Sequence, residues 1–255
     1  MRLTPDLVTH FHSDGFLHIP NVFSESEVAA MLDAVERGDR VAKTTRASQD
    51  STGRASKLAI WFDLGDDIWS AVSTNPRIVN SMRILMGEEI AFFHGKVMLK
   101  EAQEGGAWEW HQDYGYWYNQ GFAFPRMLSV FVALDPATRE NGCLQVLRGS
   151  HHLGRLDHQQ VGKQTGADPE RVAQILPLFD RVYAEMNPGD ALFFHSNTFH
   201  ASDPNTSHYH RRSFIMCYNA LANPQFREQK TFEQRPCPVS ADDAILSYAT
   251  PSLVS

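Results

Sequence analysis

The sequence predicts a mainly β fold, a β-barrel or jelly roll with helices packed outside it. Two observations carry this prediction. From residue 89 onward, short runs rich in β-branched and aromatic residues follow one another along the chain. Well-marked turn segments, such as ENG at 140–142 and NPGD at 187–190, separate these runs. Many short strands with regular turns are typical of a sandwich or a barrel.

The part before residue 89 is predicted to be mostly helical. Ser24 and Glu27 have the spacing of a capping box, which begins a helix. The polar run 39–56 has no apolar period and is expected to be a mobile loop, whereas KLAIWF (57–62) is expected to be a strand. Helices are expected at three places: 5–15, 25–38 and from 76 onward.

The second part of the chain carries the predicted strands, which one helical insert near Asp168 interrupts. No linker divides the chain, so one domain is expected over 1–255, with a helical part of about 1–88, a barrel core of about 89–222 and a C-terminal tail. The strands are expected in the runs EIAFFHGKVMLK, AWEWH, RMLSVFVALD, CLQVL, RVYAEM, ALFFH and RRSFIMCYN.

Composition narrows the classes of partner. The net charge is −7 and the basic residues are scattered, which argues against nucleic acid or an anionic membrane as the main partner. No apolar run is long enough to span a bilayer, and the first residues have no apolar core of a signal peptide. Three widely spaced cysteines are expected to be free thiols in a reducing compartment, which predicts a cytoplasmic location. The oligomeric state stays open.

The first candidate for chemistry is His111-x-Asp113. The chain contains no GxGxxG, Walker A, HExxH, CxxC or GxSxG motif, so dinucleotide, P-loop, zincin and serine-hydrolase functions lack support. On a strand, residues two apart point to the same face, so the imidazole and the carboxylate can aim at one point while Gln112 points away. A metal that needs one nitrogen and one oxygen donor can bind there.

A further histidine would complete a metal site. The strand ALFFH and the segment SNTFH supply His195 and His200 after the turn at 187–190. Two histidines and one carboxylate form the facial triad of non-haem Fe(II) oxygenases, although zinc can use similar ligands. Arg211 and Arg212 open the strand RRSFIMCYN, and only one of them can point inward. An inward arginine suits the far carboxylate of 2-oxoglutarate, which requires a planar, two-pronged cation.

The chain resembles the phytanoyl-CoA dioxygenase-like family of Fe(II)/2-oxoglutarate-dependent oxygenases, a group that includes ectoine hydroxylase. The resemblance runs from DGFLHIPNVFS (14–24) to CYNALANP (217–224). Its signature segments are WHQD (110–113), ENGCLQVLRGSH (140–151) and NPGDALFFHSNTFHASDPN (187–205) with the arginine that follows. It implies a double-stranded β-helix, which is a jelly-roll, cupin-like barrel.

The resemblance also implies roles for single residues. His111, Asp113 and His200 match the iron ligands. Arg211 and Ser202 match the residues that bind 2-oxoglutarate, and three further positions match co-substrate residues of the family: Lys57, Met98 and Trp117. Other members carry asparagine near Met98.

The implied reaction is hydroxylation of an unactivated C–H bond, with Fe(II), 2-oxoglutarate and O2 as cofactor and co-substrates and with release of succinate and CO2. Asp113 favours hydroxylation, because halogenating relatives lack this carboxylate. A small polar metabolite is the expected substrate. The alternatives are another metal-dependent barrel enzyme, such as a lyase or isomerase, and a non-catalytic metal- or ligand-binding barrel.

Several neighbouring features remain open from the sequence. His195 suits either a residue that supports the metal site or an ordinary strand-end histidine, and His151 and His152 are expected to be exposed. The aromatic residues of segment 114–118 are expected at the mouth of the barrel, facing the substrate. The runs 39–56 and 152–180 are expected to cover the pocket.

Overall fold

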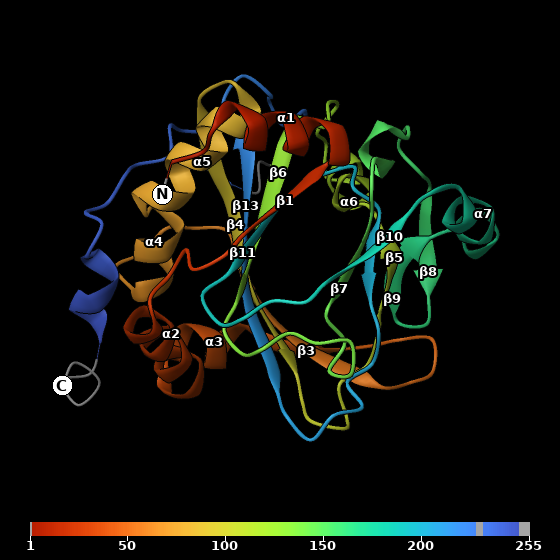
Figure 1. Cartoon of the computed structure of the whole chain (residues 1–255), viewed down its shortest axis with the longest axis horizontal. Coiled ribbons are helices and arrows are strands. Elements are labelled where there is room, and N and C mark those ends of the chain that lie inside the picture. The colour runs from red at the N-terminus through yellow and green to blue at the C-terminus, as the bar shows by residue number, and fades with distance from the viewer. Residues whose placement is uncertain (1, 228–231, 250–255) are drawn as a thin grey trace.

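The computed structural model describes residues 2–227 and 232–249, and its strands form two facing sheets (Figure 1). Within these residues the larger sheet has the strand order β1-β11-β6-β13-β4-β3-β2, and the smaller sheet has the order β10-β7-β12-β5. No strand pairing joins the two sheets in this part of the chain, so the jelly roll is an open sandwich and not a closed barrel. The predicted mainly β fold with flanking helices is confirmed.

The larger sheet takes strands from both halves of the chain. On β13, Phe214, Met216 and Tyr218 face the helices, whereas Ile215 and Cys217 face the smaller sheet. This alternation creates one core on each side of the sheet. The strands are β1 (Phe16–Ile19), β2 (Thr45–Gln49), β3 (Ala55–Trp61), β4 (Ile90–Lys100), β6 (Met127–Ala133), β11 (Ala191–His195) and β13 (Arg211–Ala220).

The smaller sheet holds the segments that carry the predicted metal ligands. Its strands are β5 (Trp108–His111), β7 (Leu144–Leu147), β10 (Arg181–Ala184) and β12 (His200–Ser202). Beside it, away from the larger sheet, lie the hairpin of β8 (His158–Val161) and β9 (Gln164–Ala167) and the helix α7 (Pro169–Ile175) (Figure 1). These three elements form most of the insert 152–180, of which only the helix was predicted.

The helices α2 to α5 lie along the larger sheet on the side away from the smaller sheet (Figure 1). The predicted capping box of Ser24 and Glu27 is present and begins α2. No helix in the described residues is both long and apolar enough to cross a membrane. The α-helices before α7 are α1 (Pro5–Asp14), α2 (Glu25–Arg37), α3 (Asp39–Thr44), α4 (Ile68–Ser73), α5 (Pro76–Met86) and α6 (Asp113–Asn119). The short 3-10 helices are η1 (Ser150–His152), η2 (Leu176–Leu178) and η3 (Ala244–Tyr248).

The structure corrects the prediction of a loop at 39–56. This run forms α3 and then β2, which pairs with β3 along its whole length. The Asp50 carboxylate then accepts hydrogen bonds from Thr52, Arg54 and Ala107 and orders the turn. Main-chain pairing needs no apolar period, so side-chain patterning did not reveal this strand. Together with β1 and β3, it shows that the first 88 residues add three strands to the sheet and are not only helical.

Candidate metal centre and co-substrate pocket

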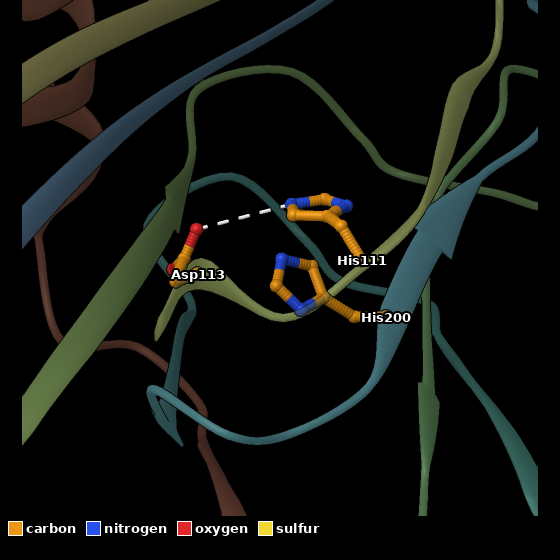
Figure 2. A group of neighbouring side chains, drawn as sticks. All are labelled: His111, Asp113 and His200. Atoms are coloured by element: carbon orange, nitrogen blue, oxygen red, sulfur yellow. Dashed lines mark ion pairs between the residues drawn. The ribbon is translucent and has the colours of Figure 1, made fainter. Parts of the chain in front are cut away.

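Three predicted ligands converge between the two sheets (Figure 2). His111 and His200 are direct register partners on β5 and β12, and their ring centroids lie 4.0 Å apart. Asp113 Oδ1 lies 3.8 Å from His111 Nε2, and one donor atom from each of the three residues lies within 4.8 Å of the others. All three side chains are buried. The spacing allows a single divalent metal to be bound by all three.

Hydrogen bonds orient each of these side chains. Nδ1 of His111 lies 2.7 Å from the Glu109 carbonyl oxygen, and Nδ1 of His200 lies 2.8 Å from that of Thr198. Each ring therefore donates through Nδ1 and leaves Nε2 free to bind a metal. The Ser129 hydroxyl donates to Asp113 Oδ2 over 2.6 Å, so Oδ1 is the oxygen that faces the imidazoles.

Burial and mutual charge keep these groups in their ligand forms. Burial lowers the pKa of His111 and of His200, and for His111 the neighbouring His200 lowers it further, so both rings are neutral. Burial alone would raise the pKa of Asp113, but the positive charge of Lys96, the two neighbouring imidazoles and the hydrogen bond from Ser129 outweigh burial and lower that pKa below its usual range. Two neutral imidazoles and one carboxylate are the donor set of a facial triad.

The route to this geometry differs from the prediction in one respect. β5 ends at His111, and Asp113 is the first residue of α6 instead of lying on the strand. Gln112 points away from the metal ligands, as predicted. Its side-chain amide donates to the carbonyls of Asn197 and Gly154, and its oxygen accepts from Leu156 N–H. Gln112 thus ties the segment before His200 to the insert.

A pocket extends from the two histidine ligands toward the start of β13. Arg211, Ser202 and Met98 line it together with His111 and His200. Arg211 is only 2% exposed, its Nε has no hydrogen-bond partner among the described residues, and its guanidinium lies over Phe131. Burial lowers its pKa to about 10, at which it is still a cation near neutral pH. An uncompensated buried cation at the end of a pocket fits the far carboxylate of a dicarboxylic acid.

Two predicted co-substrate residues lie outside this pocket, and the structure corrects both expectations. Lys57 is opposite Leu99 on the outer face of the sheet, is 49% exposed and pairs with Glu101 at 2.8 Å. Trp117 is buried in α6, where its ring packs edge-on against Phe93 at 5.7 Å. Strand register places Lys57 outward, and the helix that begins at Asp113 turns Trp117 into the core.

The tyrosines after Asp113 have main-chain partners. The Tyr114 hydroxyl donates to the Phe122 carbonyl at 3.2 Å, and the Tyr116 hydroxyl donates to the Thr165 carbonyl at 2.5 Å. Tyr116 packs against the His111 ring, and Tyr118 is exposed. These two hydroxyls therefore hold α6 and the insert in place, and are not free to orient a substrate as the sequence suggested.

The remaining histidine candidates lie outside the metal cluster. His195 ends β11, and its Nδ1 accepts from Asn197 N–H at 3.1 Å, which shapes the turn leading to His200. His151 is half-buried, with Nε2 3.0 Å from the His12 carbonyl oxygen, and His152 is exposed. The expectation of exposure thus holds only for His152.

Two lysines of the site were missed in the sequence. Lys96 lines the pocket, and its Nζ lies 3.7 Å from Asp113 Oδ1. Lys100 is fully buried and donates to the main-chain carbonyls of Ser202 and Asp203. The signal was present in the run HGKVMLK, in which His94, Lys96 and Lys100 are polar side chains on one face of an otherwise apolar strand.

Comparison with known proteins agrees with this geometry. Residues 11–213 match the family model described as Phytanoyl-CoA dioxygenase (PhyH). The chain belongs to the phytanoyl-CoA dioxygenase family. It is an Fe(II)- and 2-oxoglutarate-dependent dioxygenase, the enzyme class that the sequence predicted.

Relatives in this family act on small molecules. The chain is 27% identical over 234 residues to L-proline trans-4-hydroxylase from Streptomyces griseoviridis, covering 86% of this chain and 87% of the relative. It is 30% identical over 236 residues to ectoine dioxygenase from Bordetella bronchiseptica, covering 87% and 77%. The fold is similar to that of EctD from S. alaskensis with 2-oxoglutarate and 5-hydroxyectoine, with a TM-score of 0.74 at 22% identity over 92% of this chain and 82% of that one. The jelly-roll fold of this dioxygenase family is thereby confirmed.

Proposed function

We propose that this dioxygenase hydroxylates an unactivated C–H bond of a small, polar, anionic metabolite. One observation carries the proposal: the two histidines of a two-histidine, one-aspartate cluster line the same pocket as a buried arginine whose Nε has no partner among the described residues. A zinc or manganese lyase or isomerase would need the cluster but would have no use for the arginine.

The proposed roles follow from the contacts. His111, Asp113 and His200 hold Fe(II), which fits their neutral imidazoles and carboxylate. Arg211 binds the far carboxylate of 2-oxoglutarate, and Ser202 lies beside it in the pocket lining. Bound iron with 2-oxoglutarate and O2 supplies the C–H hydroxylation, with succinate and CO2 as co-products.

The protein contributes orientation and an apolar pocket lining. Ser129 holds the Asp113 carboxylate, and the two main-chain carbonyls hold the imidazoles, so the metal ligands are fixed before any substrate binds. Phe131, Phe194 and Ile215 line the same pocket with apolar groups, and an apolar lining strengthens each charge interaction inside it.

The substrate class is supported by the named substrates of relatives. These include L-proline, ectoine and, for a relative from Gimesia maris 28% identical over 250 residues, methylphosphonate. Each named compound is small and carries a carboxylate or an oxyphosphorus anion. We assign a compound of this chemistry to the present chain.

The whole chain is proposed to act as one domain in the cytoplasm. Strands β1, β2 and β3 from the first part pair into the same sheet as β4, β6 and β13, which supports the single domain. Cys143, Cys217 and Cys237 are buried free thiols, which supports a reducing compartment.

The test is substrate-dependent succinate release. The purified protein with Fe(II), ascorbate, O2 and 2-oxoglutarate is screened against proline and other amino acids, ectoine, and alkyl phosphonates. We expect one compound to stimulate succinate formation and to gain one oxygen atom by mass spectrometry, and His200→Ala to abolish both. Oxygen-independent conversion of a substrate, or turnover that consumes no 2-oxoglutarate, would contradict the proposal.

A further inference from the structure

A side chain of the insert holds the main chain between two of the metal ligands. The N–H of Gln112, which stands between His111 and Asp113 in the sequence, donates to Nε2 of His158 at 3.1 Å. His158 is the first residue of β8, 46 residues further along the chain. Gln112 is also the N-cap residue of α6, so its N–H needs an acceptor from outside that helix.

The His158 ring is fixed in one tautomer and one position. Its Nδ1 lies 2.9 Å from the Leu156 carbonyl oxygen, so Nδ1 donates and Nε2 keeps the lone pair that the Gln112 N–H requires. The ring lies directly against Gly115 in the first turn of α6, where an added Cβ would overlap with its Cε1, Nδ1 and Nε2 atoms. A residue without a side chain is what allows this close approach.

A second contact joins the hairpin to the metal ligands through an aromatic ring. The Tyr116 ring centroid lies 5.3 Å from that of His158 and 5.2 Å from that of His111. Its hydroxyl donates to the Thr165 carbonyl on β9 at 2.5 Å. Tyr116 thus contacts one metal ligand with its ring while its hydroxyl is held by the second strand of the hairpin.

A third contact comes from β9 and reaches the strand that ends at His111. The buried Gln164 accepts the Glu109 N–H at 3.0 Å through its side-chain oxygen and donates to the Ala107 carbonyl at 2.8 Å. The carbonyl of Glu109 is in turn the partner of His111 Nδ1. One amide side chain therefore satisfies main-chain groups of this segment and fixes the residue that orients the His111 ring.

These contacts distinguish a fixed support from a moving lid. None of the described residues that line the pocket comes from the hairpin, so the hairpin acts on the site only through the segment that carries the ligands. A hairpin that opened in every turnover would release the Gln112 N–H and the Tyr116 hydroxyl each time. Both groups adjoin metal ligands, so the ligands would lose their orientation as well.

We propose that the hairpin of β8 and β9 is a permanent support of the metal centre, and that His158 is a positioning residue that sets the direction of the His111 and Asp113 donor atoms. His158 acts through the Gln112 main chain and does not itself bind the metal. This inference rests on the proposed function, because it assigns a role toward the same metal site.

The test measures metal binding without turnover, in the absence of O2. In competition against a metal-sensitive dye, His158→Ala should weaken Fe(II) about tenfold or more. The visible band formed with Fe(II) and 2-oxoglutarate should move to a different wavelength. His158→Gln should restore part of the affinity, because its side-chain oxygen can accept the same N–H. In the metal-free protein, the Gln112 amide hydrogen should exchange with solvent at least tenfold faster in His158→Ala than in the wild type.

Gly115→Ala provides a second test that leaves the imidazole in place. The added methyl group displaces the His158 ring, so this variant alone should also weaken Fe(II) about tenfold. In the His158→Ala background the methyl group enters the space that the ring has left. The double variant should therefore bind Fe(II) about as tightly as His158→Ala alone, which is the non-additivity expected of two residues in contact.

His152→Ala is the matched control, because His152 is an exposed histidine of η1 outside the metal cluster. It should leave the Fe(II) affinity, the band and the Gln112 exchange rate unchanged. The inference is overturned if His158→Ala keeps the wild-type Fe(II) affinity and band, even where it unfolds at lower urea concentration, since His158 would then only stabilise the fold. Failure of the wild-type protein to bind Fe(II) would instead overturn the proposed function, and this inference with it.

Discussion

Arg211 and Arg212 are neighbours on β13 and face opposite sides of the larger sheet. The guanidinium of Arg211 is buried in the pocket with Nε unpartnered in the described residues, whereas Arg212 donates to Asp135 at 2.7 and 2.8 Å and to Glu36 at 2.9 Å. One arginine is therefore held ready for a ligand, and the other is part of the protein's own structure.

Because the two arginines face opposite sides, the same substitution by methionine should affect co-substrate affinity at one position and stability at the other. Arg211→Met should weaken 2-oxoglutarate at least tenfold and leave the free energy of unfolding of the metal-free protein unchanged or raised, because an apolar side chain replaces a buried charge. Arg212→Met should lower the free energy of unfolding by about 2 kcal/mol, because Asp135 loses its charged donor. Urea unfolding and anaerobic 2-oxoglutarate titration of both variants check this. Equal effects on co-substrate affinity would contradict the division of roles.

Ser129 is predicted to tune metal affinity through Asp113. Its hydroxyl donates to the carboxylate oxygen that faces away from the imidazoles. Ser129→Ala should weaken Fe(II) roughly 10- to 100-fold, as loss of a partner of a metal ligand commonly does. Ser213→Ala is the control, because the Ser213 hydroxyl is buried on the same sheet without a hydrogen-bond partner in the described residues. Competition against a metal-sensitive dye gives both affinities, and an unchanged value for Ser129→Ala would refute the role.

Gln112 is predicted to stabilise the segments on either side of the site. Its side chain bonds two carbonyls and one N–H, from Asn197, Gly154 and Leu156. Gln112→Leu leaves these buried groups unsatisfied and should lower the free energy of unfolding by about 2–3 kcal/mol. The control is the exposed Gln160, whose side chain donates only to the Gly162 carbonyl. Gln160→Leu should lower the free energy of unfolding far less. Equal decreases in the free energy of unfolding for the two variants would show that the Gln112 hydrogen bonds do not stabilise the fold more than those of Gln160.

Glu27 is predicted to make stability depend on acidic pH. Burial alone would raise its pKa, but hydrogen bonds from Arg77 and Ser24 outweigh burial and lower the pKa below its ordinary value of 4.5. The unfolded chain therefore binds a proton first, so this stabilisation is complete above pH 4.5 and is lost as pH falls through the lower folded pKa. The gap in unfolding free energy between wild type and Glu27→Gln should be wide near neutral pH and should shrink below about pH 4. A gap that stays constant would disprove the linkage.

The sequence predicted the cluster of His111, Asp113 and His200 better than the residues around it. His111, Asp113 and His200 lie where the predicted motif places them, because strand pairing of β5 with β12 brings the two histidines face to face. That one of the two arginines points into the pocket follows from the alternation of side chains between the two faces of β13. The co-substrate role predicted for Lys57 was wrong, because strand register turns its side chain outward. One sequence does not reveal that register. Lys96 was missed because its place in the site depends on a tertiary contact with Asp113, the first residue of α6.

The helices and strands were likewise predicted well where local sequence determines them and poorly where tertiary contacts do. Helices with caps and apolar periodicity, such as α2 with its capping box, were predicted closely. The polar strand β2 and the hairpin of β8 and β9 were not, because main-chain pairing and contacts such as that of Gln112 N–H with His158 hold them. Tertiary pairing, and not local pattern, determines these elements.

The most direct test of the central claim is an anaerobic titration of the purified protein with Fe(II) and 2-oxoglutarate. If His111, Asp113 and His200 hold the metal and Arg211 anchors the co-substrate, a weak visible charge-transfer band should appear only when both are present. Asp113→Ala should abolish the band, and Arg211→Met should shift it to higher 2-oxoglutarate concentrations. Absence of the band in folded wild-type protein at saturating Fe(II) and 2-oxoglutarate would contradict the account.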